Sequence, residues 1–165
     1  MQIPFLQEKW YLHLIIQDSH MNKPTIDELL KVLRDEITFS SSIIRDTDYN
    51  NAEKRTQNSL IKQLKNIYLN ENVDEEYAIG GHKTCRIDVD LFNGTYGIEL
   101  KVAHQLSKFS NVLRLLGQVV YYNKKHYHGN MIVMVVGKEK DKDAALKEVA
   151  QYIEELGVHF IYKIV

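Results

Sequence analysis

The residue types best suited to chemistry lie in residues 86–102, where two short alternating segments flank Asn93-Gly94. Asn and Gly tolerate the positive φ angles of a type I′ turn, so this dipeptide predicts a tight β-hairpin. With these two residues as the loop, the register places Asp88 directly opposite Glu99. Carboxylates opposed in this way have Cβ atoms about 4.5–5.5 Å apart.

Two carboxylates held this close repel each other, and a divalent cation between them would relieve the repulsion. Mg²⁺ binds oxygen ligands, takes one or two carboxylates and completes its shell with water and substrate phosphate, and Mn²⁺ is the expected substitute. Lys101 lies two positions after Glu99 and therefore on the same strand face. The pattern therefore indicates a site for a divalent cation with a lysine beside it.

Two-residue alternation divides the hairpin into two faces. We expect the core face to carry Ile87, Val89, Leu91, Ile98, Leu100 and Val102. The other face then carries Arg86, Asp88, Asp90, Glu99 and Lys101. Asp90 opposes Gly97 in this register, so we rank it below Asp88 as a ligand and expect it at the surface. The alternative for the whole charged set is a solvated sheet face without chemistry.

Asp88 followed eleven positions later by Glu99-Leu100-Lys101, in a hairpin, resembles the PD-(D/E)xK nuclease superfamily, with Ile87 in place of the proline. Downstream, Gln118-Val-Val-Tyr-Tyr122 is similar to the QxxxY motif of the RecB-like and lambda-exonuclease-like branches. The resemblance covers roughly residues 50–137 and includes the order of the elements.

This resemblance implies a restriction-endonuclease-like fold and Mg²⁺-dependent hydrolysis of DNA. Asp88, Glu99 and the backbone carbonyl of Leu100 would bind the metal, and Lys101 would position or activate water and stabilise the transition state. Glu53 lies where many members carry an additional acidic ligand. The resemblance adds Gln118 to the catalytic residues, and the expected nucleic-acid contacts are Arg114, Tyr122 and Arg86.

Several alternatives stay open at this level. Glu53 could simply favour the positive end of its helix dipole, and Gln118 and Tyr122 could be ordinary helix residues. His126 and His128 lack a third ligand, so we expect a loop end there rather than a metal site. The nuclease-like domain could be an inactive nucleic-acid or protein-binding subunit, or a dimeric junction resolvase.

The elements that must position these residues follow from hydrophobic periodicity. Helices are predicted over about 26–37, 52–68, 108–125 and 142–155. Strands are predicted near 75–79, 84–91, 95–102, 131–136 and 158–164, with a turn through Gly80-Gly81-His82. The order α-α-β-β-β-α-β-α-β is typical of an α/β domain with a mixed central sheet flanked by helices.

Size and composition limit the remaining possibilities. The 165 residues are expected to form one domain, with an N-terminal helical extension over about 1–50 and the nuclease-like core over about 51–165. With 21 basic and 22 acidic residues the formal charge is −1, which provides no overall basic field for nucleic acid. A single cysteine, Cys85, excludes an internal disulfide framework, and no apolar run is long enough for a membrane helix. We expect a cytoplasmic protein that is monomeric or a small homo-oligomer.

Overall fold

The computed structural model describes residues 23–45, 51–81 and 84–165. The helices are α2 (Ile26–Asp35), α3 (Ala52–Ile67), α4 (Phe109–Tyr122) and α5 (Ala144–Glu155). The strands are β1 (Val73–Ala78), β2 (Arg86–Leu91), β3 (Tyr96–Val102), β4 (Met131–Gly137) and β5 (His159–Ile164). This order confirms the predicted α/β fold class.

The five strands form one mixed sheet in the order β1-β2-β3-β4-β5. β1, β2 and β3 pair antiparallel, whereas β3, β4 and β5 pair parallel through crossovers that contain α4 and α5. Antiparallel neighbours can be joined by short turns and parallel ones need longer crossovers, so the topology follows from the spacing of the strands along the chain.

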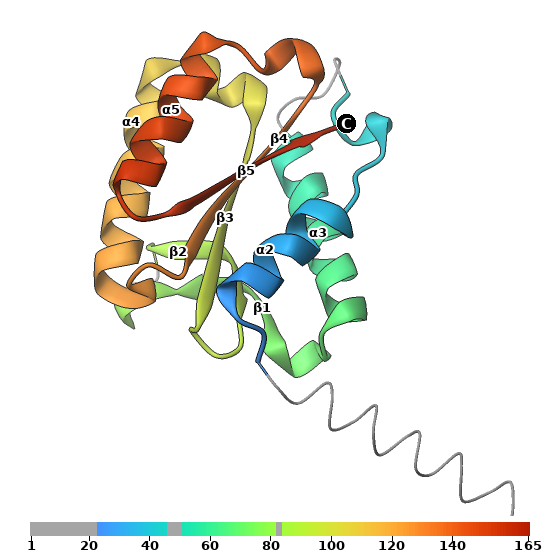
Figure 1. Ribbon diagram of the computed structural model, residues 1–165, viewed down its shortest axis with the longest axis vertical. Coiled ribbons are helices and arrows are strands. Elements are labelled where there is room, and N and C mark those ends of the chain that lie inside the picture. The colour runs from blue at the N-terminus through green and yellow to red at the C-terminus, as the bar shows by residue number, and fades with distance from the viewer. Residues whose placement is uncertain (1–22, 46–50, 82–83) are drawn as a thin grey trace, which may run out of the picture.

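Helices cover both faces of the sheet: α2 and α3 pack on one face, and α4 and α5 on the other (Figure 1). β4 shows this arrangement residue by residue. Its residues Ile132, Met134 and Val136 point into the cluster beneath α2 and α3, while Met131, Val133 and Val135 point into the cluster beneath α4 and α5. The prediction that the strand is apolar at every position because it is covered on both faces is confirmed.

Local signals explain where several helices begin and end. The Thr25 side chain accepts a hydrogen bond from Glu28 N while Glu28 reaches back to Thr25 N, the predicted capping box that starts α2. Asp143 caps α5 by accepting from Leu146 N. The predicted helix over 108–125 instead ends as α-helix at Tyr122 and continues as a π turn, Asn123–Tyr127, which His128 closes in the left-handed conformation.

The hairpin between β2 and β3 has the predicted register, since Leu91 pairs with Tyr96. Its turn is wider than the predicted two-residue loop, because Thr95 N donates to Leu91 O at 3.1 Å. Positive φ angles occur at Asn93 and Gly94, as expected, and also at Phe92. A four-residue loop preserves the same register because it adds one residue to each side.

The expected core face of β2 requires a correction at Ile87. Val89 and Leu91 belong to the cluster beneath α2 and α3, whereas Ile87 belongs to the cluster beneath α4 and α5. Ile87 Cδ1 lies 2.8 Å from where a Cβ on Gly97 would be. The alternation therefore breaks at Asp88, where β2 turns from one core to the other.

The segment predicted as an N-terminal extension is only partly described. Within it, α2 contributes Leu29, Leu30 and Leu33 to the same core as α3 and the sheet, so this part packs as core. Residues 1–22 and 46–50, and His82 of the predicted turn, lie outside the described residues. In the part of the chain that is described, no helix has the length and apolar character needed to cross a bilayer.

Candidate metal centre and phosphate-binding cavity

The β2–β3 hairpin brings Asp88 beside the end of β3. Regular pairing runs from Leu91–Tyr96 to Val89–Ile98, and at the next position Asp88 Oδ2 accepts a hydrogen bond from Leu100 N at 2.7 Å. The carboxylate thus takes the place of a backbone acceptor. This contact fixes Asp88 next to the strand residues Glu99 and Lys101.

Lys101 is the centre of the site. Its Nζ lies 2.9 Å from Glu99 Oε1, 3.2 Å from Glu53 Oε1 and 3.9 Å from Asp88 Oδ2. The same ammonium donates to the backbone carbonyl of Leu100 at 2.9 Å. One cation is therefore surrounded by three carboxylates and a carbonyl oxygen, all residues that the sequence singles out.

Burial and mutual repulsion control the protonation of these carboxyls. Burial raises the pKa of Glu99 to about 8, and the charge of Asp88 adds to the rise. Burial also raises the pKa of Asp88. For Lys101 burial alone would lower the pKa, but the charges of Glu99, Asp88 and Glu53 outweigh it and the pKa rises. The site holds more negative groups than one lysine neutralises when all are ionised.

The oxygen atoms fit a hard divalent cation. Glu99 is 1% exposed, and its Oε2 is buried without a hydrogen-bond partner among the described residues. A buried acceptor left unpaired is costly, and a bound cation would satisfy it. Across the described ranges no group of three His, Cys, Asp or Glu side chains has the spacing of a metal cage. Mg²⁺ needs only one or two carboxylates with carbonyl and water oxygens, which Asp88, Glu99 and Leu100 O supply.

The first turns of α3 support the site from the opposite side. Glu53, in the first turn, ion-pairs with Lys101, and Gln57, one turn later, donates from Nε2 to Asp88 O at 2.9 Å. Gln57 is buried and also accepts from Lys54 Nζ at 3.2 Å. Glu53 therefore lies in the first turn of α3 and also beside Lys101 at the candidate metal site, so both interpretations of this residue stay open.

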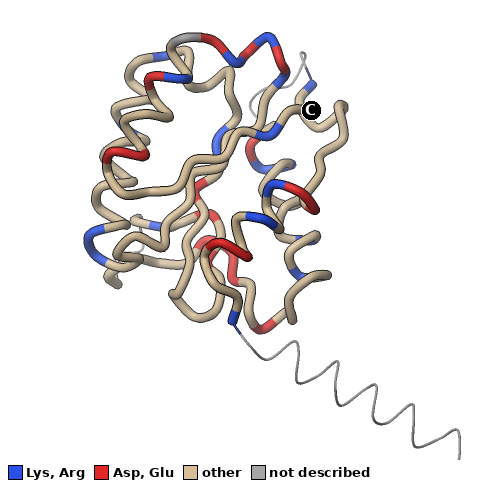
Figure 2. Tube along the Cα trace, viewed as in Figure 1, with Lys and Arg blue, Asp and Glu red and all other residues tan. Residues whose placement is uncertain are grey.

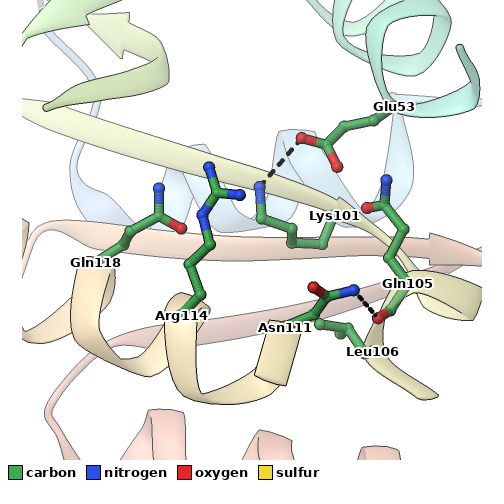
Figure 3. Close-up of a pocket in the computed structure, with 7 residues that line it drawn as sticks. All are labelled: Glu53, Lys101, Gln105, Leu106, Asn111, Arg114 and Gln118. Carbon is green, nitrogen blue, oxygen red and sulfur yellow. Dashed lines mark hydrogen bonds and ion pairs between the residues drawn. The ribbon is translucent and has the colours of Figure 1, made fainter. Parts of the chain in front are cut away.

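A cavity of about 120 Å³ opens beside Lys101. It is lined by Glu53, Lys101, Gln105, Leu106, Asn111, Arg114 and Gln118. Arg114 and Gln118 project from α4 toward Lys101, while Glu53 approaches from α3 (Figure 3). Gln118 Oε1 is buried without a hydrogen-bond partner within the described residues. The cavity thus brings the cations of Lys101 and Arg114 together with an unpaired amide oxygen and the Glu53 carboxylate.

The three predicted nucleic-acid contacts lie in different surroundings. Arg114 is exposed and lines the cavity. Tyr122 is 3% exposed and its hydroxyl donates to Arg86 O at 3.0 Å, which gives it a structural contact. The Arg86 guanidinium pairs with Glu76 at 3.3 Å and is not among the residues lining the cavity. Of the three, Arg114 is the one placed to meet a substrate there.

Asp90 corrects the expectation of a surface residue. It is 0% exposed, and its carboxylate accepts from Tyr127 Oη and from Gly94 N, both at 2.7 Å. The Tyr127 ring covers this face of the hairpin, where a Cβ on Gly97 would lie 2.4 Å from the ring. Burial raises the pKa of Asp90. Asp90 therefore fastens the hairpin to the π turn.

Sequence patterns missed three contributors to the site. Gln57 lies four residues after Glu53, and Asn111 three residues before Arg114, so helical periodicity could have found both. Gln105 belongs to a 3₁₀ segment, Ala103–Ser107, where no periodic signal exists. The backbone carbonyl of Gln105 accepts from Asn111 Nδ2 at 2.7 Å.

Comparison with protein-family models, curated proteins and solved structures found no match for this chain.

Proposed function

We propose that this protein is a metal-dependent nuclease that hydrolyses DNA phosphodiester bonds. The observation that carries the proposal is the convergence of Glu53, Asp88 and Glu99 on Lys101 at the edge of the cavity that Arg114 lines. Carboxylates for a divalent cation beside two fixed cations are what phosphoryl-group hydrolysis needs. The choice of DNA rests on the resemblance of the sequence motifs.

Asp88, Glu99 and the Leu100 carbonyl would hold Mg²⁺, with Mn²⁺ as a substitute, and Glu53, whose Oε1 lies 3.2 Å from Lys101 Nζ, would be a further acidic ligand. When bound, the metal would lower the pKa of a water molecule and neutralise charge on phosphate oxygens. Without metal, the charges of Glu99, Asp88 and Glu53 raise the pKa of Lys101. Lys101 would therefore supply a hydrogen-bond donor and a positive charge beside the phosphate.

Arg114 and Gln118 would hold the substrate. The planar guanidinium of Arg114 can bind two non-bridging phosphate oxygens at once, and the cavity residue Gln118 has an amide that can donate to a third oxygen or to the attacking water. The amides of Gln105 and Asn111 add neutral polar groups to the cavity wall. Binding by hydrogen bonds inside the cavity removes the need for a strongly basic surface, which this chain of net charge −1 lacks.

The test is cleavage of single-stranded, duplex and branched DNA by the purified protein with Mg²⁺, with Mn²⁺ and with a chelator. We expect cleavage only with metal, and loss of at least about a hundredfold in Glu99→Ala and Lys101→Ala. Glu75→Ala is the matched control, because Glu75 is an exposed carboxylate on the edge strand β1. Absence of cleavage with every substrate, or equal cleavage by all three variants, overturns the proposal.

A second candidate is a DNA- or protein-binding subunit that keeps the fold without the reaction. The observation that favours it is that Lys101 already neutralises part of the carboxylate charge through Glu99 and Glu53. Calorimetric titration with Mg²⁺ and Mn²⁺ separates the candidates. A nuclease binds the metal and loses that binding in Glu99→Gln, whereas a pure binding subunit shows no metal affinity in either protein.

A further inference from the structure

The cavity beside Lys101 is rich in uncharged amides. Of the 7 residues that line it, three have carboxamide side chains: Gln105, Asn111 and Gln118. They come from the 3₁₀ segment after β3 and from α4, a helix in which Arg114 is the only charged residue of 14 (Figure 2). This wall of the cavity can therefore select a ligand by the direction of its hydrogen bonds as well as by charge.

Two of these amides offer acceptor oxygens to the cavity. Asn111 Nδ2 donates to the backbone carbonyl of Gln105, which can only accept, so Asn111 Oδ1 points away from Gln105 (Figure 3). Gln118 Oε1 is buried and has no hydrogen-bond partner within the described ranges. Buried acceptors without partners are costly. A ligand that fits this wall must therefore supply hydrogen-bond donors.

The side-chain amide of Gln105 offers a donor and an acceptor side by side. It forms no hydrogen bond with any other residue that the structure describes. In Figure 3 it lies at the opposite end of the cavity from Gln118. A carboxamide of this kind pairs with a ligand edge on which a donor and an acceptor are adjacent.

A DNA strand carries suitable donors only on its bases. Its phosphate, ester and sugar-ring oxygens all accept, and an internal deoxyribose has no hydroxyl group. Adenine and cytosine place an amino group beside a ring nitrogen that accepts, which is the edge a carboxamide recognises. The cavity volume of about 120 Å³ is several times the roughly 30 Å³ of one water molecule, and Leu106 adds an apolar surface for a ring.

We propose that this cavity binds the base of a nucleotide next to the scissile phosphate, and that Gln105 and Asn111 determine which base is accepted. The inference rests on the proposed nuclease activity. Gln105 would pair with the amino group and ring nitrogen of adenine or cytosine, and Asn111 Oδ1 would accept the second amino hydrogen. Thymine has a carbonyl oxygen in place of the amino group and would leave these acceptors unpaired.

Binding a base in the cavity also selects the form of the substrate. A base that enters a cavity has left its stack and its pairing partner, which costs free energy in a duplex and least in a single strand. We therefore expect single-stranded DNA to be cleaved faster than duplex DNA of the same sequence.

The first test measures binding of dAMP, dCMP and dTMP to the full chain by NMR titration with Mg²⁺ present. These monoesters contain no phosphodiester bond, so binding is measured without cleavage. We expect dAMP and dCMP to bind at least about fivefold more tightly than dTMP. Gln105→Ala should abolish this difference and leave the affinity for inorganic phosphate unchanged. Asn58→Ala, which removes an exposed amide on α3, is the matched control and should keep the preference.

The second test maps the cut sites in a randomised library of single-stranded DNA. We expect thymine to be depleted at one fixed position beside the cut in the parent. Gln105→Glu should enrich cytosine at that position, because a carboxylate accepts from the cytosine amino group. Cleavage without a base preference beside the cut overturns the inference and leaves the nuclease activity intact.

The binding test decides the inference even if the protein cleaves no DNA. Equal binding of the three nucleotides, or a preference that survives Gln105→Ala, overturns it. Tighter binding of AMP and CMP than of dAMP and dCMP, without a base preference, assigns the acceptors to a 2′-hydroxyl group and also overturns it. A base preference that depends on Gln105, in a protein that cleaves nothing, supports the base-binding cavity and refutes the nuclease activity alone.

Discussion

Replacing Glu99 by glutamine should stabilise the metal-free protein at neutral pH while removing its metal binding. Glu99 is 1% exposed, and burial together with the Asp88 charge raises its pKa from 4.5 to about 8. A carboxyl with a raised pKa opposes folding above its unfolded pKa, because the unfolded chain releases the proton while the folded chain retains it. Stability should therefore fall as pH rises from about 4.5 to about 8.

The size of the effect follows from the two pKa values. At pH 7 the unfolded state gains about 3 kcal/mol from ionising this one group, whereas the folded state gains almost nothing. For a chain of 165 residues, that corresponds to a decrease in melting temperature of roughly 6–12 °C. Glutamine has nearly the same shape and does not ionise, so the variant should lack this decrease.

The assay is thermal unfolding in a chelator across pH 4 to 9 for the parent, for Glu99→Gln and for Glu75→Gln. We expect the parent and Glu99→Gln to melt alike near pH 4 and to diverge as pH rises, while exposed Glu75→Gln follows the parent. Adding Mg²⁺ should restore stability to the parent alone, because a ligand that binds only the folded state stabilises it. If Glu99→Gln melts at or below the parent at pH 8, Glu99 is ionised and held by Lys101, and the reasoning is wrong.

Four further outcomes follow from the contacts around the site. Lys101→Met should lower the melting temperature in chelator at pH 9, above the pKa of about 8 of Glu99, because the ionised Glu99 and its neighbours then lose their shared cation. Mg²⁺ should raise that temperature more than in the parent, and an unchanged value would contradict the ion-pair network. Tyr127→Phe removes a donor from buried Asp90 and should cost about 1–3 kcal/mol in urea unfolding. Gly97→Ala drives a methyl group into the Tyr127 ring and should cost at least as much, but less in a Tyr127→Ala background; additive losses would refute the contact. Arg114→Lys should reduce kcat/KM for cleavage roughly tenfold, since lysine keeps the charge and loses the two-pronged geometry.

The sequence predicted those parts of the site that depend on local geometry. Asn93-Gly94 determined the register that brings Asp88 beside β3, and the alternation along β3 placed Glu99 and Lys101 on one face. These features depend on turn chemistry and on the two-residue period of a strand, both of which can be recognised in a short segment.

The errors came from features set by distant parts of the chain. The two-residue alternation assumes that β2 is flat and that one of its faces is in solvent. In the structure both faces are covered. Asp90 is buried, and Ile87 belongs to the cluster beneath α4 and α5. The residue that covers Asp90 is Tyr127, which lies on a π turn that no local pattern indicated. Gln105 enters the cavity only because the chain after β3 forms a 3₁₀ segment there.

The site residues come from two parts of the fold, the packed sheet and the side of helix α4, and they differ in how readily they can be substituted. Asp88, Glu99 and Lys101 belong to or adjoin the interior of a sheet that is packed on both faces, so a change there disturbs the fold as well as the chemistry. Asn111 and Arg114 stand on one side of a helix and are not needed to hold the strands together. Under the proposed nuclease activity, laboratory evolution toward a new substrate should therefore accumulate changes on α4 and leave the hairpin unchanged.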